Sequence, residues 1–274
     1  MISFPNAKIN IGLNITEKRS DGFHNLESIF LPIIGLHDVL EIVAVRDNQD
    51  FQFTASGIPI DGKENDNLVV KAYQLLKSDF SLPALHVHLH KVIPTGAGLG
   101  GGSSDASFML KMLNEMFALN LTNEILKVYA EKLGSDCPFF IENTPQYATG
   151  KGEQLENLAF FIPSSYFAII KPPIHIPTKV AFAGIMPKKN EFSIKEIAAK
   201  LPHQWKNLAK NDFEASIFDE YPEIKKIKNR LYELGADYAS MSGSGSAVFG
   251  FFPHKINLAN EFENYFKWQN YIRF

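Results

Sequence analysis

The alternation of apolar and polar residues predicts several strands in the first third of the chain. In AKINIGLNI, apolar residues occupy every second position from Ile9 to Ile15, which is the period of a β-strand. HDVLEIVAV and FQFTAS show a similar pattern, and LHVHLHKV alternates aliphatic residues with three histidines before Pro94 ends the strand. The N-terminal third is therefore expected to be rich in strands.

A second period, that of the α-helix, occurs between and after these strands. NLVVKAYQLLKS, TNEILKVYAEKLG and PEIKKIKNRLYELG carry apolar residues at helical spacing, and the segment SDASFMLKMLNEMFAL does so from Ser104 on. Further strands are expected in SSYFAIIK and SAVFGFF. Because strands and helices are mixed along the whole chain, the pattern predicts an α/β (α+β) protein.

Chain length and a change of sequence texture favour two domains. A chain of 274 residues exceeds the usual size of one domain. After Gly150 the sequence becomes polar and rich in glycine in GKGEQLENL, as linkers between domains often are. We expect an N-terminal domain over residues 1–153 and a C-terminal domain over residues 154–274.

Composition and charge exclude several classes of protein. The formal net charge is −3 and the basic residues are scattered, so the basic surface needed for nucleic-acid binding is missing. No apolar run approaches the roughly 18–20 residues of a membrane span, and the first ten residues lack the pattern of a secretion signal. A single cysteine, Cys137, allows no internal disulfide. We therefore expect a cytoplasmic protein that binds neither nucleic acid nor membrane.

The segment VIPTGAGLGGGSSDAS, between a predicted strand and a predicted helix, is the strongest candidate for function. Its five glycines between Gly96 and Gly102 leave many backbone N–H groups without side-chain cover, which suits a phosphate ligand. No lysine follows the glycines, and this excludes a P-loop. Gly96, Gly98 and Gly101 match the dinucleotide fingerprint, but a helical pattern occupies the place of the acid-ended strand expected about 20 residues later.

Three segments together resemble the motifs of one kinase family. PNAKINIGLNITEKRSDGFHNLESIF, IPTGAGLGGGSSDAS and MSGSGSAVF occur in the order and approximate spacing of the three motifs of the GHMP kinases, named for galactokinase, homoserine kinase, mevalonate kinase and phosphomevalonate kinase. DGFHNL and LGSDCPFF are similar to one branch of that family, which acts on a cytidine diphosphate derivative of methylerythritol in the non-mevalonate route to isoprenoid precursors. The resemblance covers most of the chain.

This resemblance implies an ATP-dependent kinase that phosphorylates the 2-hydroxyl of that small molecule, with Mg²⁺ as cofactor. It also implies a ribosomal-protein-S5-like N-terminal domain and a ferredoxin-like C-terminal domain. The catalytic pair would be Lys8 and Asp136, a cation and a carboxylate, which is a sufficient set for phosphoryl transfer. The residues implied in ATP binding form the first glycine loop: Pro94, Thr95, Gly96, Ala97, Gly98, Leu99, Gly100, Gly101, Gly102, Ser103 and Ser104.

The same resemblance implies a site for the cytosine base. Phe23 and Phe182 would stack on the two faces of the ring, and His24 would hydrogen-bond its edge. Asn10 and Thr178 would lie near the rest of the substrate. The family usually has tyrosine where this chain has Phe23, so the ring can still stack but the phenol hydroxyl is missing. Base recognition is expected to be retained in outline.

Other interpretations remain open. Within the family, the chain could be another small-molecule kinase similar to mevalonate kinase. Outside the enzymes, the dinucleotide fingerprint is compatible with a non-enzymatic dinucleotide-binding module. The ligands of Mg²⁺ and the oligomeric state are not assigned.

Some polar residues near these motifs have simpler structural interpretations. Cys137 is expected to be a small buried residue, as lone cysteines usually are. Asp105 is expected in the first turn of a helix, where a carboxylate complements the helix dipole. His86, His88 and His90 lie on one side of a strand, and without acidic or cysteine partners at ligand spacing we expect a polar strand face rather than a metal site.

Overall fold

The chain folds into two compact units, each assembled from separate stretches of sequence. The structure is a computed structural model that describes residues 1–45, 50–159, 162–163, 165–188 and 192–273. Because each unit contains separate stretches of sequence, these units are not equivalent to the continuous domains expected over residues 1–153 and 154–274. That domain division stays a prediction. Unit 1 comprises Met1–Lys8, Pro32–Thr95 and Gly100–Thr144, and unit 2 comprises Ile9–Leu31, Gly96–Leu99 and Pro145–Phe274.

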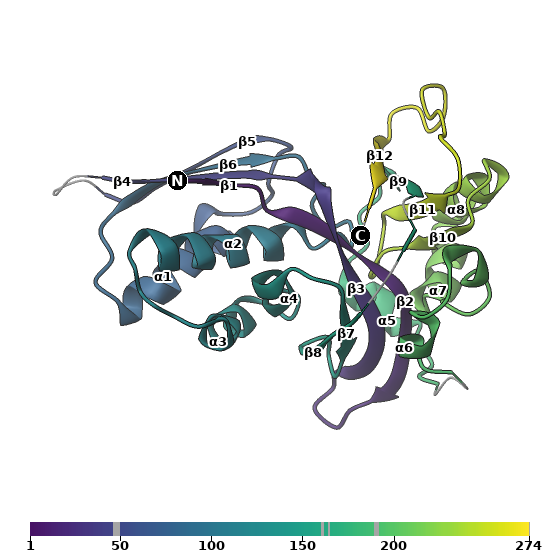
Figure 1. Ribbon diagram of the computed structural model, residues 1–274, viewed down its shortest axis with the longest axis horizontal. Helices are drawn as coiled ribbons and strands as arrows, with labels where there is room; N and C mark the ends of the chain where they lie inside the picture. The colour runs from purple at the N-terminus through teal and green to yellow at the C-terminus, as the bar shows by residue number, and fades with distance from the viewer. Residues whose placement is uncertain (46–49, 160–161, 164, 189–191, 274) are drawn as a thin grey trace. The chain divides into compact units, whose positions relative to one another are not determined.

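Unit 1 contains a four-stranded sheet with helices packed on one face (Figure 1). Strand β5 is parallel to β6, and the other neighbours are antiparallel. The strands, in their order across the sheet, are β1 (Ile2–Ser3), β4 (Val39–Ala44), β6 (Leu85–Lys91) and β5 (Gln52–Gly57). The helical segments are η1 (Glu64–Asp66), α1 (Leu68–Asp79), α2 (Gly101–Met116), α3 (Asn123–Leu133) and α4 (Cys137–Glu142).

The core of unit 1 is the apolar layer between this sheet and its helices. Alternate residues of β4 and β6, such as Leu40 and Val87, are buried together with the apolar faces of α1 and α2. Helix α1 begins after Asn67, whose side chain accepts a hydrogen bond from the backbone N–H of Val69. This packing fixes α2, and with it the end of the glycine loop that leads into α2.

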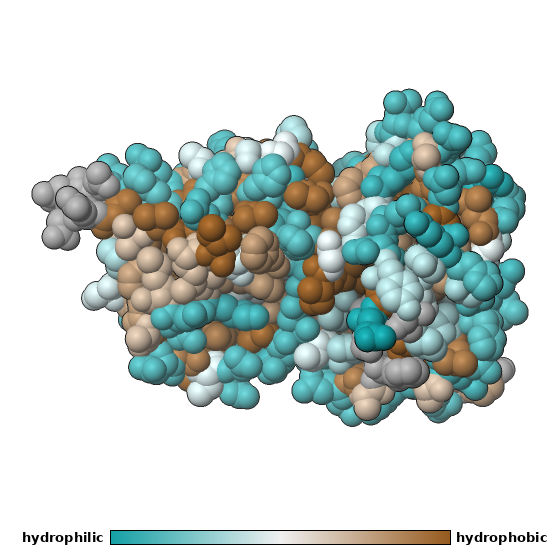
Figure 2. Space-filling model, turned by 45° about the horizontal axis from the view of Figure 1, so that its top comes forward, coloured by the Kyte–Doolittle hydropathy of each residue, from teal (hydrophilic) through white to brown (hydrophobic). Residues whose placement is uncertain are grey.

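The opposite face of the same sheet carries the three histidines of β6. Thr54 Oγ1 lies 2.8 Å from Nδ1 of His88, and Ser56 Oγ lies 2.9 Å from Nδ1 of His90. The expected polar strand face is therefore present, although His86 is more buried than His90. Among the described residues, no group of three or more His, Cys, Asp or Glu side chains could hold a metal ion. Figure 2 shows polar and hydrophobic residues mixed over this part of the surface.

Unit 2 is built around two further four-stranded sheets. The long strands β2 and β3 each contribute residues to both units. The first sheet has the order β2 (Asn6–Lys18), β3 (His24–His37), β7 (Gln146–Thr149) and β8 (Gln154–Asn157). The second sheet has the order β10 (Tyr238–Met241), β11 (Val248–Phe252), β9 (Ser165–Lys171) and β12 (Phe266–Ile272). The helical segments are α5 (Thr178–Ala183), α6 (Ile194–Ile197), η2 (Pro202–Gln204), α7 (Phe213–Glu220) and α8 (Pro222–Glu233).

The second sheet of unit 2 follows the ferredoxin-like β-α-β-β-α-β plan for most of its length. All its neighbouring strands are antiparallel, and β9 lies between β11 and β12. Helices α7 and α8 come between β9 and β10 in the sequence and contribute Ile217 and Ile227 to the core that includes residues of this sheet. The described stretch 253–265, between β11 and β12, contains no helix. The ferredoxin-like expectation is thus confirmed in strand arrangement and modified in this last connection.

Two local predictions differ from the structure. Helix α2 begins at Gly101 rather than near Ser104, so the last glycines of the loop belong to its first turn. Strand β2 is buried on both faces from Asn6 to Ile15 rather than on alternate residues, which is usual for a strand in the interior of a protein rather than at its surface. No helix in the described part of the chain is long and apolar enough to cross a membrane.

Candidate active site

Lys8 and Asp136, the expected catalytic pair, form an ion pair within unit 1. Nζ of Lys8 lies 3.1 Å from Oδ2 of Asp136. The side chain of Lys8 is 4% exposed, whereas that of Asp136 is 31% exposed. Because a lysine in a strand usually lies at the surface, its burial beside a carboxylate points to a specific role. The exposed part of Asp136 remains accessible to a ligand.

Local sequence explains where Asp136 is placed. Asp136 directly precedes helix α4, whose first turn contains Pro138. Proline is favoured at this position because the missing N–H would have no partner inside the helix. The side chain of Asp136 makes no capping hydrogen bond to α4. The carboxylate is therefore fixed at the start of the helix and directed to Lys8 instead.

Gly100 brings the start of helix α2 next to this ion pair. It is the N-cap residue of α2 and has a φ of +70°, a conformation that favours glycine. A Cβ added at Gly100 would lie 2.9 Å from Cγ of Lys8 and 2.9 Å from Cζ of Phe140. The N-terminus of a helix attracts phosphate through its free N–H groups and its dipole. Unit 1 thus places the N-terminus of α2 directly beside Lys8, the lysine of the expected catalytic pair.

The serine and cysteine side chains near the start of α2 have distinct environments. The hydroxyl of Ser104 is buried and has no hydrogen-bond partner among the described residues, so a polar group of a bound nucleotide would satisfy it. Ser107 Oγ donates to the backbone oxygen of Cys137 at 2.7 Å. Burial raises the pKa of the Cys137 thiol to about 12, which keeps it unreactive at neutral pH. Cys137 is a structural residue, as predicted.

The earlier part of the glycine loop, Gly96–Leu99, belongs to unit 2 and is held there by a second glycine loop. Residues 241–247, MSGSGSA, form this second loop. Ser242 Oγ donates to the oxygen of Gly98 at 2.8 Å, and the N–H of Ala247 donates to the oxygen of Ala97 at 3.1 Å. A Cβ added at Gly98 would lie 2.0 Å from the oxygen of Ser242. The second loop therefore fixes the backbone of the first.

The residues that hold the second loop were missed by the sequence analysis. Nδ2 of Asn211 donates to the backbone oxygens of Met241 and Gly243, both at 2.8 Å. Oε1 of Glu214 accepts from the N–H of Met241 at 2.9 Å, and its Oε2 lies 2.5 Å from Nζ of Lys228. Both residues lie in KNDFEAS at the start of α7. Asparagine and glutamate are usually exposed, and only the structure shows that these two are buried.

Two of the residues expected near the substrate, Asn10 and Thr178, lie in regular elements of unit 2. Asn10 is buried in β2, and its Nδ2 donates to Oγ of Ser28 at 2.9 Å. Thr178 is the first residue of α5, and Phe182 follows one turn later. Residues four apart lie on the same face of a helix, so α5 presents Thr178 and Phe182 together.

The aromatic residues expected at the cytosine base contact other side chains of unit 2, and their stacking on the base stays a prediction. The rings of His24 and Phe182 stack on each other, with centroids 5.0 Å apart and planes at 22°. Phe23 is 57% exposed, and Nζ of Lys151 lies 4.9 Å from its ring centroid, within reach of a cation–π contact. No ring contact joins Phe23 to Phe182 among the described residues. Lys151, which the sequence analysis did not single out, covers the ring of Phe23.

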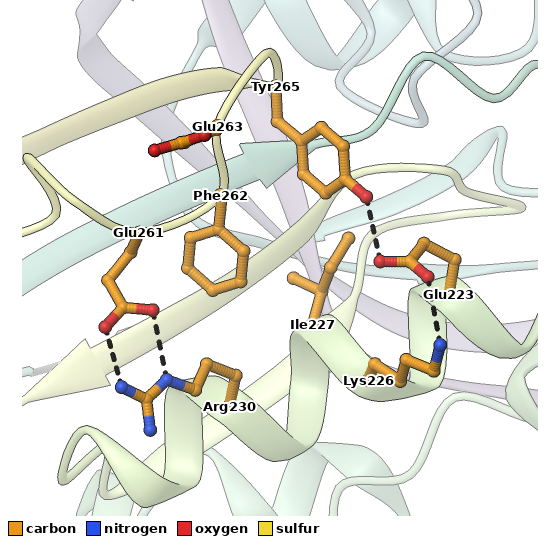
Figure 3. A pocket seen from close by; sticks show the side chains of 8 residues that line it. All are labelled: Glu223, Lys226, Ile227, Arg230, Glu261, Phe262, Glu263 and Tyr265. Carbon is orange, nitrogen blue, oxygen red and sulfur yellow. Dashed lines mark hydrogen bonds and ion pairs between the residues drawn. The ribbon is translucent and has the colours of Figure 1, made fainter.

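A cavity of about 300 Å³ elsewhere in unit 2 is a weaker candidate for a phosphate site (Figure 3). It lies between α8 and the loop before β12, and none of the expected site residues lines it. Arg230 pairs with Glu261 at 2.6 Å, and Lys226 pairs with Glu223 at 3.4 Å. The basic groups drawn there are therefore neutralised by carboxylates of the same cavity, which weakens any attraction for an anion.

Comparison with known proteins decides the family. The model of the GHMP kinases N terminal domain matches residues 67–143, and that of the GHMP kinases C terminal domain matches residues 191–267. The chain is 50% identical to a 4-diphosphocytidyl-2-C-methyl-D-erythritol kinase of Bacteroides fragilis, over the full length of both chains. The chain belongs to the GHMP kinase family. GHMP kinases are ATP-dependent phosphotransferases that act on small molecules, so ATP is supported as the phosphoryl donor.

Solved structures of GHMP kinases have the same fold. The crystal structure of a 4-(cytidine 5'-diphospho)-2C-methyl-D-erythritol kinase is 31% identical, has a TM-score of 0.79, and covers 92% of this chain and 90% of that chain. The mevalonate kinase of Methanococcus jannaschii has a TM-score of 0.73 at 12% identity and covers 98% of this chain and 97% of that chain. The second likeness concerns the fold alone. The expected two-domain GHMP kinase fold is confirmed.

Proposed function

We propose that this chain catalyses the ATP-dependent phosphorylation of the 2-hydroxyl of 4-diphosphocytidyl-2-C-methyl-D-erythritol, in the cytoplasm, as a step of isoprenoid precursor synthesis. The observation that carries the proposal is the 3.1 Å ion pair of Lys8 and Asp136 beside Gly100, at the start of helix α2. The substrate is proposed from the relatives, of which the one from Bacteroides fragilis is 50% identical over its full length.

The residues of the ion pair have complementary roles in this reaction. The bond between the γ-phosphorus of ATP and its bridging oxygen breaks, and a bond forms from the 2-oxygen of the alcohol to the same phosphorus. The proton of the 2-hydroxyl passes to the carboxylate of Asp136, which is partly exposed and can accept it. Lys8 stabilises the negative charge that develops on the transferring group and on the attacking oxygen. Phosphoryl transfer depends chiefly on such positioning and charge stabilisation.

The glycine loop, Pro94 to Ser104, is proposed to hold the triphosphate of ATP. The free N–H groups at the start of α2 and the partnerless hydroxyl of Ser104 are suited to phosphate oxygens. Mg²⁺ commonly binds through substrate phosphates and water with few protein ligands, which fits the lack of a three-residue metal cluster in the described part of the chain. When bound, Mg²⁺ would neutralise charge on the phosphates.

The cytosine base is proposed to bind at the aromatic residues of unit 2. Phe23 presents an exposed ring, and Phe182 is already stacked on His24. Stacking of a base on Phe23 requires the Lys151 ammonium to leave the ring face, where it could then meet the diphosphate of the same substrate. Asn10 and Thr178 are proposed to contact the remainder of the molecule.

The proposed function is tested by measuring ADP release with several alcohols. The cytidine substrate, mevalonate and homoserine are compared at equal ATP and Mg²⁺, and Lys8→Met serves as a control for contaminating kinases. We expect kcat/KM for the cytidine substrate to exceed that for mevalonate at least about 100-fold, because a site with specific hydrogen bonds rejects ligands that lack the matching groups. Chelation of Mg²⁺ should abolish turnover.

The same assay separates the two alternatives. A higher kcat/KM for mevalonate would show that the chain is a different GHMP kinase. Turnover that cytidine nucleotides do not inhibit would favour the same alternative. Binding of a dinucleotide without any ATP turnover would favour the non-enzymatic module. Either result would contradict the proposed function.

A further inference from the structure

Three charged side chains are buried together beneath the start of helix α2. Lys91 is the last residue of β6, Asp38 directly precedes β4, and Asp105 lies in α2. Their side chains are 2%, 0% and 3% exposed, respectively. Nζ of Lys91 contacts Oδ2 of Asp38 and lies 2.7 Å from Oδ2 of Asp105. Asp105 therefore does not lie at the exposed helix terminus as expected, and its carboxyl group belongs to a buried cluster.

This cluster contacts both ends of the glycine loop. Oδ1 of Asp38 accepts from the backbone N–H groups of Val92 at 2.6 Å and Ile93 at 2.8 Å, which directly precede the loop. At the other end, a Cβ added at Gly101 would lie 3.3 Å from Nζ of Lys91. Asp105 is one helical turn further along the same helix. The cluster thus joins the residues before the loop to the residues after it, all within unit 1.

The raised pKa of Asp105 limits the negative charge that the cluster places beneath the loop. Burial raises the pKa of Asp105 to about 8, with Lys91 acting in the opposite direction and Asp38 in the same direction. Burial lowers the pKa of Lys91, but Asp105 and Asp38 more than compensate and leave it above its usual value. The positive end of α2 remains available to attract phosphate.

We propose that Lys91, Asp38 and Asp105 are positioning residues for ATP, because their cluster fixes the two ends of the glycine loop in the conformation that receives the phosphates. The inference rests on the proposed function for the identity of the nucleotide. None of the three side chains needs to touch ATP. Their contribution is geometric, and a displacement of about 1 Å in a binding element can change rates by as much as about 100-fold.

Asp38→Asn is the primary test variant. The amide oxygen can still accept from Val92 and Ile93, and Lys91 keeps its 2.7 Å hydrogen bond to Asp105, so the variant should fold. The ionic contact of the Asp38 carboxylate with Lys91 is lost, however. We therefore expect the KM for ATP to rise on the order of 10-fold, and the KM for the alcohol to stay within about 2-fold of the wild-type value. Asp105→Asn should cause a smaller rise in the same direction, since this residue binds no loop N–H.

Lys127→Met provides a matched control within unit 1. It removes the 2.9 Å ion pair of Lys127 and Glu142, which connects α3 and α4 away from the loop. This control should leave both KM values unchanged. An unchanged KM for ATP in a folded Asp38→Asn variant, or an equal rise in the KM of both substrates, would overturn the proposal and reduce the cluster to a stabilising element.

Direct calorimetry of ATP binding without the alcohol separates this proposal from the proposed function. A wild-type chain that binds ATP but does not turn over the cytidine substrate contradicts the function alone, and the weaker binding expected for Asp38→Asn still tests the cluster. If Asp38→Asn binds ATP as tightly as the wild-type chain, the cluster does not position the loop. A wild-type chain that fails to bind ATP would overturn both proposals.

Discussion

The residues proposed for catalysis in unit 1 and those proposed for base recognition in unit 2 are held in opposite ways. Lys8 is almost fully buried, and its ammonium is paired with Asp136. Phe23 is more than half exposed, and the ammonium of Lys151 lies 4.9 Å from its ring centroid. The chemical group is therefore fixed before substrate arrives, as electrostatic catalysis requires. The ring proposed for base recognition is exposed and is not used in the chemical step, so changes in it are expected mainly to alter substrate affinity.

The two glycine loops show a related contrast. The ends of the first loop are joined by a buried cluster of charges, Lys91, Asp38 and Asp105. The second loop is held mostly by backbone hydrogen bonds to Asn211 and Glu214. A buried charge left without its partner is more costly than a neutral group left without one. Removal of one charge beneath either loop, at Lys91 or in the Glu214–Lys228 pair, should therefore be less tolerated than substitution of the neutral Asn211.

The largest effect is expected from the catalytic pair. Asp136→Asn and Lys8→Met should lower kcat by a factor on the order of 10² to 10⁴, because each removes a group used in the transition state. The affinity for ATP, measured by calorimetry, should remain nearly unchanged in Asp136→Asn. A near-normal kcat in Asp136→Asn would contradict the proposed catalytic role of Asp136. Unit 1 and unit 2 would then no longer differ in the way described above.

A large effect on ATP binding is expected from a very small change in the first loop. The nearest atom to a Cβ added at Gly102 would be Cδ1 of Leu68 at 3.9 Å, an ordinary contact, and alanine is favoured over glycine in a helix by about 1 kcal/mol. Gly102→Ala should therefore not lower the free energy of unfolding. If the phosphates approach this backbone closely, the added methyl group should still weaken ATP binding on the order of 10-fold. If the wild-type chain and Gly102→Ala bind ATP with equal affinity, the phosphates do not bind close to the backbone at Gly102.

A moderate effect is expected from the aromatic residues. Phe23→Ala and Phe182→Ala should each raise the KM of the cytidine substrate roughly 5- to 150-fold, the equivalent of about 1 to 3 kcal/mol of lost base stacking. The KM for ATP should be spared. Phe4→Ala is a matched control, because Phe4 is 56% exposed and Phe23 is 57% exposed. Equal behaviour of Phe23→Ala and Phe4→Ala would show that exposure, and not base recognition, explains Phe23.

The smallest effect on activity, but a clear effect on stability, is expected from Asp105→Asn. Burial raises the pKa of Asp105 from 3.8 to about 8 in the folded chain, where Lys91 and Asp38 face it. Between these values the folded state holds a proton that the unfolded state has lost, so this group lowers the free energy of unfolding as pH rises from about 4 to about 8. Asp105→Asn should lack that slope in urea unfolding from pH 5 to 8. Identical slopes for both proteins would contradict the raised pKa.

The sequence predicted best where function imposes a local pattern. The glycine loop, the pair of Lys8 and Asp136, and the helices α1, α3 and α8 follow from spacing and from resemblance, because each is encoded within a short segment. Polar residues that are buried by partners distant in the sequence carry no comparable local pattern. Asn211 and Glu214 look like surface turn residues until their partners, residues 240–243 and Lys228, are known.

The buried cluster illustrates the same limit. Asp38, Lys91 and Asp105 are far apart in the sequence, and each residue type is usually exposed. Asp105 was interpreted by its nearness to a helix start, but the helix begins earlier and the carboxyl group points to Lys91. Only the pairing of β4 with β6 and the packing of α2 bring the three together.

The position of the transferred phosphate tests the central claim most directly. The wild-type chain is incubated with ATP, Mg²⁺ and the cytidine substrate labelled with ¹³C at carbon 2, and the product is examined by ³¹P and ¹³C NMR. We predict one new phosphomonoester signal that is coupled to carbon 2, formed in equal amount with ADP. Release of ADP without this signal, or a new phosphate on any other carbon, would contradict the proposed reaction.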